Sequence, residues 1–419
     1  MAHWFHRNPL KATVLVKFEA LQKSSKGATC KEIITKLKAG RACFQELVSK
    51  HSSAVDEVTV AFTEYAGLLR GLVDAPEGGD SKLRGLTSFK WTSSCLGRTP
   101  SIQTDAWFEV ISVVMQLAIW HTKHAAHIAM DDSISVDQAK EVHRSLKLAA
   151  GMFLNVKETL LPKLQATPDK GVDTDQRVVD AYAQQAQGEA QEVTIGRALE
   201  MGHKASVIFS LAMETAAIFK QAADALKTLD PVLFGKWGHY LGLKAAVYEA
   251  YAYCFYGKEL LELEKCGESI RVLRHAQALS TQASKMCDRY NRTKGAGTIA
   301  HPERHPFFQK LAPMVKLHLD KSERENGFIY HHKVPEELPV IEKKQVYGLA
   351  TPEDFTLPPH HPLWTPEAYA AFEVSAQASE KYDTKASAAQ EEIAPVQEPD
   401  IAPGKIPQPK STKSDCTIS

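Results

Sequence analysis

Apolar residues recur at helical spacing over much of the chain, most clearly between Ser135 and Leu161. There they return at alternating steps of three and four residues, which places them on one face of an α-helix. Ser135 followed by Gln138 forms a capping-box signal, and Pro162 is a stop signal just after the pattern. The sequence therefore predicts an amphipathic helix here. Its buried face consists of Ala139, Val142, Leu146, Ala149, Phe153, Val156 and Leu160.

Three further segments have helical patterns. Residues 106–120 are apolar on nearly every side, as expected for a helix that other helices surround, and they are too few to cross a bilayer. Residues 177–201 and the segment that begins at Ala205 also follow helical spacing, and Gly202 and His203 mark a turn between them. We expect these last two helices to form an antiparallel hairpin.

Strand signals are scarce, with residues 13–16 and 328–330 as the two short candidates. Around Tyr253 the spacing of small residues matches one copy of a tetratricopeptide-like hairpin, in which Gly257 allows a second helix to approach at Ser269. These patterns predict an all-α fold of stacked helical hairpins with minor β-structure. Such stacks curve and present a concave face.

The helix that begins at Ala205 has an unusually wide apolar arc. Its centre contains Ile208, Ala212 and Phe219, and Val207, Leu211 and Ile218 lie along one flank. A helix covered by a single neighbour needs an apolar face of only about 100°. The flank is therefore either covered by a second neighbour or open as a groove, in which an amphipathic helix of a partner could lie.

Composition limits the possible functions. The chain has 419 residues, 44% of them hydrophobic, and 50 basic against 50 acidic residues, which suits a globular body and argues against a general nucleic-acid binder. Its first residues lack a secretory signal, and Ala2 stands where N-myristoylation needs glycine, so we expect cytosolic synthesis. The seven scattered cysteines indicate reduced thiols. They are Cys30, Cys43, Cys95, Cys254, Cys266, Cys287 and Cys416.

The end of the chain has its own character. Residues 376–415 are rich in Ala, Ser, Glu, Lys and Pro, which predicts a flexible tether with a reach of roughly 35 Å. The last four residues, 416–419, read Cys-Thr-Ile-Ser, the pattern of a farnesylation box. We therefore expect a covalent farnesyl group on Cys416 and attachment to a membrane. Basic residues near this cysteine are too dispersed to add a second membrane signal.

Catalytic and metal-binding patterns are poor. His301 and His305 are four residues apart, but each precedes a proline, which disfavours the helical spacing that would aim both at a metal. Residues 294–298 form a glycine-containing loop without the lysine-threonine end of a phosphate loop. We expect no catalytic residue, no metal site and no bound cofactor, and therefore not an enzyme.

Four motifs together resemble the Bro-one domain family. They are HWFHRNPLK at 3–11, EVHRSLK at 141–147, EAQEV at 189–193 and ENGFIY at 325–330. The resemblance covers about residues 1–375 and implies a banana-shaped helical domain with a tetratricopeptide-like core. It also implies a partner, because family members bind the C-terminal amphipathic helix of ESCRT-III charged multivesicular body proteins on the concave face.

The family's binding patch falls on Thr194, Val207 and Leu211 of this chain. Val207 and Leu211 belong to the flank that the helical arc leaves open, and Ile218 continues that flank. Thr194 departs from the family, which has a large aromatic there, so we expect a shallower pocket. A second surface is expected at Tyr330 and Tyr347.

The sequence thus predicts a monomeric adaptor with a Bro-one-like body over 1–375, a tether over 376–415 and a lipid at Cys416. It would act on the cytosolic face of nuclear-envelope or endosomal membranes and also have a cytosolic pool. The alternative is a cytosolic, tetratricopeptide-like peptide-binding scaffold whose terminal cysteine is unmodified.

Overall fold

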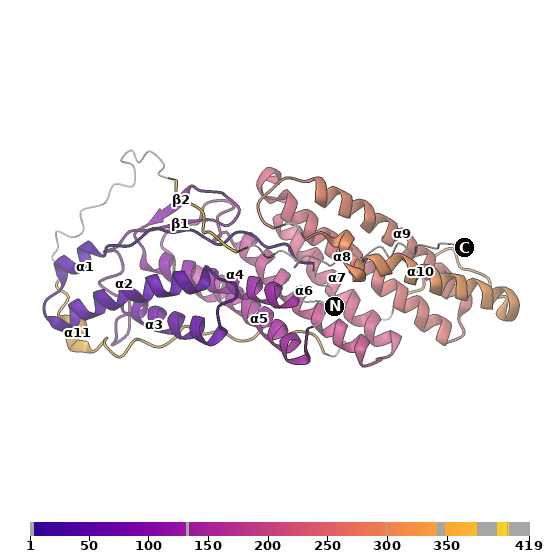
Figure 1. The fold of residues 1–419 in the computed structure, drawn as a ribbon, viewed down its shortest axis with the longest axis horizontal. Helices are drawn as coiled ribbons and strands as arrows, with labels where there is room; N and C mark the ends of the chain where they lie inside the picture. Colours follow the sequence, from indigo (N-terminus) through magenta and orange to yellow (C-terminus); the bar gives the residue numbers. More distant parts are fainter. Residues whose placement is uncertain are drawn as a thin grey trace, which may run out of the picture.

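The computed structural model describes residues 4–130, 134–298, 300–341, 348–374, 392–399 and 401. Within them the chain forms an elongated helical body with one two-stranded sheet (Figure 1). The helices are α1 (Glu19–Ser24), α2 (Ala28–Val48), α3 (Val55–Val73), α4 (Ala106–Ala129), α5 (Val136–Asn155), α6 (Gln176–Glu200), α7 (Ala205–Leu226), α8 (Pro231–Glu262), α9 (Cys266–Arg292), α10 (Pro306–Glu325) and α11 (Pro366–Ala370). The predicted all-α class is confirmed.

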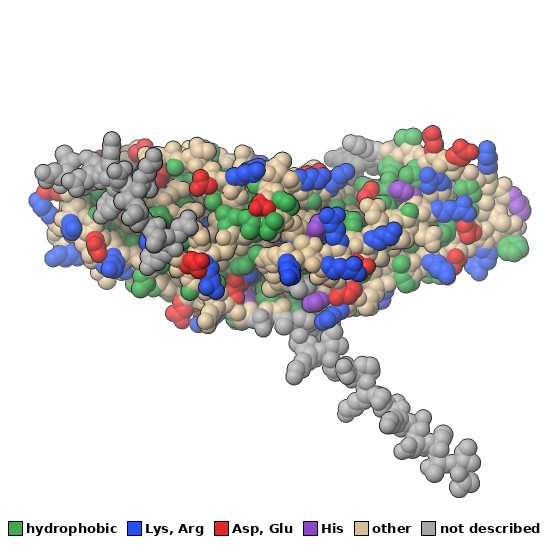
Figure 2. All heavy atoms as spheres, turned by 90° about the horizontal axis from the view of Figure 1, so that it is seen from above, with side chains coloured by type: hydrophobic (Ala, Val, Ile, Leu, Met, Phe, Trp, Pro, Cys, Tyr) green, Lys and Arg blue, Asp and Glu red, His purple; other side chains and the backbone are tan. Residues whose placement is uncertain are grey.

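The helices pack on one another in nearly sequential order. α4 packs on α5, α5 on α6, α6 on α7, α7 on α8, α8 on α9 and α9 on α10. The sheet and α1 to α3 lie at one end of the body, and α7 to α10 lie at the other (Figure 1). On the face drawn in Figure 2, basic and acidic side chains are interspersed, in keeping with a formal net charge of zero.

The predicted helix after Ser135 is confirmed, together with its cap. The Ser135 hydroxyl accepts from the Gln138 N–H at 3.2 Å, and the Gln138 side chain accepts from the Ser135 N–H at 2.8 Å. This reciprocal pair satisfies two donors that a helix start otherwise leaves unpaired. α5 ends at Asn155, and a π-helical turn (Val156–Leu160) and a 3-10 turn (Leu161–Lys163) continue its path.

The predictions for α4 and for the two hairpins also hold. All residues of α4 except His127 and Ile128 are buried, as a helix surrounded by others requires. α6 and α7 are joined by a tight turn in which Gly202 has a φ of 67°. Between α8 and α9 a Cβ added at Gly257 would lie 2.4 Å from Leu273 Cγ, and Ser269 donates to the Gly257 carbonyl at 2.7 Å. The small residues thus permit the predicted close approach.

Both predicted strands were wrong. Thr13 makes a single bridge to Trp91 at the edge of the sheet, and residues 14–16 add no further pairing. Residues 328–330 belong to a π-helical turn (Asn326–Tyr330) after α10. The actual strands are β1 (Phe89–Thr92) and β2 (Pro100–Gln103), which pair antiparallel. A short apolar run becomes a strand only where a partner edge is available along its whole length.

A buried carboxylate in each half of the body joins segments that are distant in sequence. Glu109 on α4 accepts from Arg41 and Tyr65 at 2.8 Å and from Trp91 at 2.6 Å. Glu189 on α6 is likewise fully buried. Such polar groups are stable in an interior only when they are hydrogen-bonded.

The Glu189 site fixes the N-terminal segment inside the body. Both terminal nitrogens of Arg7 donate to Glu189, at 2.9 and 2.7 Å, and Arg7 Nε donates to the Thr122 carbonyl at 2.8 Å. Tyr240 on α8 and Gln185 on α6 donate to the same carboxylate at 2.8 and 2.9 Å. The extended N-terminal segment therefore links α4, α6 and α8.

The part of the predicted tether that the structure describes lies against the body. Ile393 is buried, its N–H donates to the Arg98 carbonyl at 3.0 Å, and Val396 and Ile401 pack against apolar clusters. Residues 392–399 and 401 therefore differ from the expectation of a free tether. The prediction rested on the composition of residues 376–415 as a whole, which does not reveal that Ile393, Val396 and Ile401 can each contact the body.

Candidate functional site

A cavity of about 400 Å³ opens between α5, α6 and α7. Thr194 on α6 and Val207 and Leu211 on α7 all line it, so the structure brings together three of the residues that sequence analysis assigned to partner binding. The flank of α7 is therefore partly open. Val207 is 37% exposed at the rim, whereas Leu211 is 2% exposed and forms part of the floor.

Ile218 does not line this cavity. It lies on the same helix, but 11 residues after Val207, which is about 16 Å along the axis. Its half-buried side chain lies on the same face of α7 as Val207 and Leu211, but beyond the part of that face that is open. The cavity thus does not include Ile218, and its role in partner binding stays a prediction, because helical periodicity identifies a face and not how far a neighbouring helix covers it.

Thr194 lies beside a histidine that was not predicted as part of the site. Its hydroxyl is 3.4 Å from His143 Nε2 and donates to the Ala190 carbonyl at 3.5 Å. Burial lowers the pKa of His143, and nearby Lys147 adds to this shift, so the imidazole is neutral at pH 7. The floor of the cavity at this point is thus uncharged.

Other lining residues were also missed. They include Ala139, Lys140 and His143 from α5, and Val193, Arg197 and Met201 from α6 or its end. Met201 is 61% exposed, and such an apolar side chain beside a cavity suits a contact surface. Sequence analysis placed Ala139 on the buried stripe of α5, and Arg197 follows Thr194 by one helical turn, so spacing could have identified both once α5 was known to border α6.

The rim carries more positive than negative charge. Lys140 and Arg197 line it together with Glu200. Lys140 pairs with Asp137 at 2.9 Å and Arg197 with Glu200 at 3.7 Å, but all four of these side chains are more than half exposed. Exposed pairs of this kind are worth at most about 1 kcal/mol and can exchange for a ligand. The site therefore combines an apolar floor with exchangeable basic groups.

The proposed second surface is only partly within the described residues. Tyr330 ends the turn after α10, where it is half-buried with its ring 5.6 Å from that of His332. The neighbouring Phe328 and Ile329 are 82% and 64% exposed. Tyr347 lies outside the described residues.

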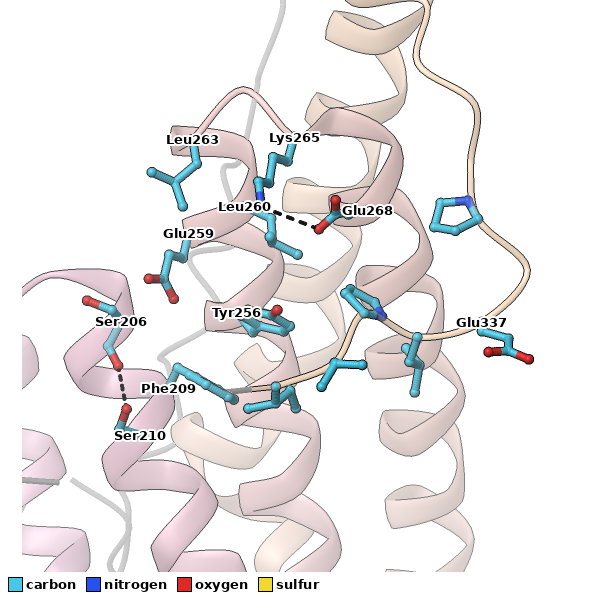
Figure 3. A pocket seen from close by; sticks show the side chains of 15 residues that line it. Ser206, Phe209, Ser210, Tyr256, Glu259, Leu260, Leu263, Lys265, Glu268 and Glu337 are labelled. Atoms are coloured by element: carbon cyan, nitrogen blue, oxygen red, sulfur yellow. Dashed lines mark hydrogen bonds and ion pairs between the residues drawn. The ribbon is translucent and has the colours of Figure 1, made fainter. Parts of the chain in front are cut away.

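A second cavity, of about 610 Å³, lies on the adjacent face of α7 (Figure 3). α8, α9 and residues 335–341 complete its walls. The rings of Phe209 and Tyr256 stack at 4.8 Å on its inner side. Glu259 and Glu337 lie at its edge, and Lys265 and Glu268 form an ion pair at 4.0 Å. Sequence analysis did not predict this cavity, because residues of four separate segments line it.

No metal-binding cluster of three or more His, Cys, Asp or Glu side chains occurs in the part of the chain that the structure describes. His301 pairs with Glu303 at 3.2 Å, and His305 caps the start of α10. The six described cysteines are unpaired, and only Cys43 among them is exposed. None of the described helices is both long and apolar enough to cross a membrane.

Known proteins provide an independent assignment. The family model for the BRO1-like domain matches residues 8–387. The BRO1 domain-containing protein BROX of Danio rerio is 44% identical over 407 residues, covering 97% of this chain and 98% of its own. The BROX protein of Homo sapiens is 45% identical over 377 residues, covering 90% and 92%. The chain therefore belongs to the BRO1 domain family, which confirms the resemblance seen in its motifs.

A solved structure supports the fold. The structure described as the ALIX BRO1 CHMP4C complex matches with a TM-score of 0.61 and 20% identity, over 84% of this chain and 98% of that one. At this identity the match concerns the architecture, and it agrees with the elongated helical body.

The exposure of the two α7 residues leads to a stability prediction. Leu211→Asp should lower the free energy of unfolding by more than about 3 kcal/mol, because it places an unpaired carboxylate in the floor. Val207→Asp at the rim should change it by less than about 1 kcal/mol. Urea denaturation of both variants checks this, and equal losses would show that the rim is as closed as the floor.

Proposed function

We propose that this protein is an adaptor that binds the C-terminal amphipathic helix of an ESCRT-III charged multivesicular body protein in the groove between α5, α6 and α7. The observation that carries the proposal is the placement of Val207 and Leu211, one helical turn apart, with Thr194 in one cavity of a BRO1-type body. The ALIX BRO1 domain, a structural neighbour, has been solved in complex with CHMP4C.

The shape and charge of the groove suit such a ligand. An amphipathic helix presents apolar anchors at spacings of three and four residues, about 6 Å apart along its axis, which matches the rise between Val207 and Leu211. Lys140 and Arg197 at the rim favour acidic residues on its polar face. Thr194 offers less contact area than an aromatic residue, so we expect an affinity lower by about 1 kcal/mol or more than in relatives with an aromatic there.

A lipid on Cys416 would complete the function. A farnesyl group at this cysteine contributes about 0.8 kcal/mol for each methylene buried in a bilayer, yet a single lipid binds only marginally. A weak lipid contact and a weak helix contact on one chain reinforce each other through effective concentration. The protein would then reside on the cytosolic face of nuclear-envelope or endosomal membranes, where Tyr330 and Tyr347 could meet a further partner. The cytosolic scaffold with an unmodified cysteine is the alternative.

The groove proposal predicts that Val207→Asp weakens binding of a CHMP4C C-terminal helix peptide by at least about tenfold, which corresponds to 1.4 kcal/mol. The introduced carboxylate must be desolvated against the apolar face of the ligand. Val232→Asp, at a 76% exposed apolar position outside the cavity on α8, is the matched control and should bind normally. Isothermal titration measures the affinity of both variants for the peptide. An unchanged affinity of the Val207 variant would contradict binding in the groove.

The anchor proposal predicts that Cys416→Ser releases the protein from membranes while its affinity for the same peptide stays constant. Flotation of cell membranes measures the first property and titration the second. Intact-mass measurement of the wild-type protein from cells gives the modification directly. An unmodified mass would support the scaffold alternative, and full membrane recovery of the Cys416 variant would contradict the anchor.

A further inference from the structure

Residues 392–399 and 401 contact the body through the half-buried carboxylate of Glu398 and three apolar side chains. Glu398 Oε2 lies 2.5 Å from Lys123 Nζ on α4, and Glu398 Oε1 accepts from the Leu10 N–H at 2.8 Å. Glu398 thus reaches the N-terminal segment and the central helix together. Figure 1 draws residues 392–399 in yellow, next to the sheet.

Lys123 needs this carboxylate. Its side chain is 3% exposed, and burial lowers the pKa of its ammonium group, whereas Glu398 opposes that shift. Leaving such a cation buried without its partner is strongly unfavourable. The carboxylate of Glu398 is itself only 18% exposed, so the pair is largely shielded from water.

The apolar side chains distribute the contact over two parts of the body. Ile393 is 7% exposed, and Val396 packs against the main core. Ala394 and Val396 also border a cavity of about 620 Å³ that residues 12–17 and α2 complete. Ile401 packs against a smaller apolar cluster that contains Val193, and Val193 lines the groove between α5, α6 and α7.

We propose that the body has a second peptide-binding site, separate from the groove, and that residues 392–399 and 401 of the same chain occupy it as a clip. The site recognises an extended segment. In this segment two apolar residues, Ile393 and Val396, are three positions apart, and the carboxylate of Glu398 follows two positions later. The Lys123 ammonium and the Leu10 amide bind the carboxylate, and the Arg98 carbonyl binds the backbone at Ile393.

The clip determines where the end of the chain leaves the body. Cys416 is 15 residues after Ile401, which limits their separation to about 50 Å even for a fully extended chain. If the body released the chain at Val374, the limit would be roughly 150 Å. The clip therefore shortens the reach of Cys416 to about a third of what release at Val374 would allow. Its use as a membrane positioner depends on the proposed lipid at Cys416, but the binding site itself does not.

Hydrogen exchange tests the clip in the full-length, unprenylated protein. The Ile393 amide should be protected in the wild type, and Glu398→Lys should accelerate its exchange by at least about tenfold, because like charges then face each other at Lys123. Glu392→Lys is the matched control, since Glu392 is 65% exposed and 3.9 Å from Arg98, and it should change the rate by less than about fivefold. An unprotected wild-type amide, or equal acceleration in both variants, would overturn the proposal.

A peptide of residues 390–403 tests whether the site binds in trans. Glu398→Lys protein, with its own segment displaced, should bind the wild-type peptide at least about tenfold more tightly than wild-type protein does, because the wild-type site is occupied. The same peptide with Glu398→Lys should not bind. Equal binding of the two peptides would contradict carboxylate recognition. Glu398→Gln is a milder variant, and this protein should also bind the wild-type peptide more tightly than wild-type protein does.

Distances between spin labels test the effect on Cys416. In a Cys43→Ser background, nitroxides on Cys416 and on Met201→Cys at the groove rim should give a shorter and narrower distance distribution than in the Glu398→Lys variant. Identical distributions would overturn the positioning role. Because this protein carries no lipid, the result is independent of whether cells prenylate Cys416, which the intact mass reports separately.

Discussion

The ion pair between Arg7 and Glu189 is the interaction on which the arrangement of this body depends. It is completely enclosed. Tyr240 and Gln185 also donate to the carboxylate, and the carbonyls of Thr122 and His6 accept further guanidinium donors. Breaking a pair of this kind is costly, because the remaining charge stays buried without a partner. The N-terminal segment thereby becomes part of the interior, and α6 is held in place. Since Val193 and Thr194 follow Glu189 on the same helix, this interaction also fixes one wall of the groove.

The groove, the tail site and the terminal cysteine form a connected arrangement around α4, α5 and α6. Lys123 on α4 holds the tail through Glu398, and Ile401 ends the described tail at the cluster behind Val193. A lipid on Cys416 would then be joined to the body by a short stretch of chain that starts near the groove. A shorter connection raises the avidity of the two contacts, because the effective concentration of the second contact depends on the distance between the two sites. A tail released at α11 would weaken this coupling.

Local signals predicted the helices well, whereas contacts distant in sequence could not be predicted. The helix cap of α5 involves Ser135 and Gln138, which are three positions apart. The close approach of α8 and α9 involves Gly257 and Ser269, which belong to one hairpin. Residues 13–16 failed as a strand because pairing depends on a distant edge at Trp91. For the groove, periodicity predicted that Val207, Leu211 and Ile218 lie on one face of α7. It could not predict how much of that face stays open, because this depends on how the neighbouring helices pack. The clip was missed because Glu398 finds its partner at Lys123, more than 270 positions earlier.

The most direct test of this account is a double-mutant cycle at Arg7 and Glu189, measured by urea denaturation. Arg7→Met and Glu189→Leu should each lower the free energy of unfolding by about 3–5 kcal/mol, because each leaves one buried charge unpaired. The double variant should lose far less than the sum of the two, since both charges are then absent. Losses that add within about 0.5 kcal/mol would show that the two side chains act independently, and would contradict the view that this pair organises the body.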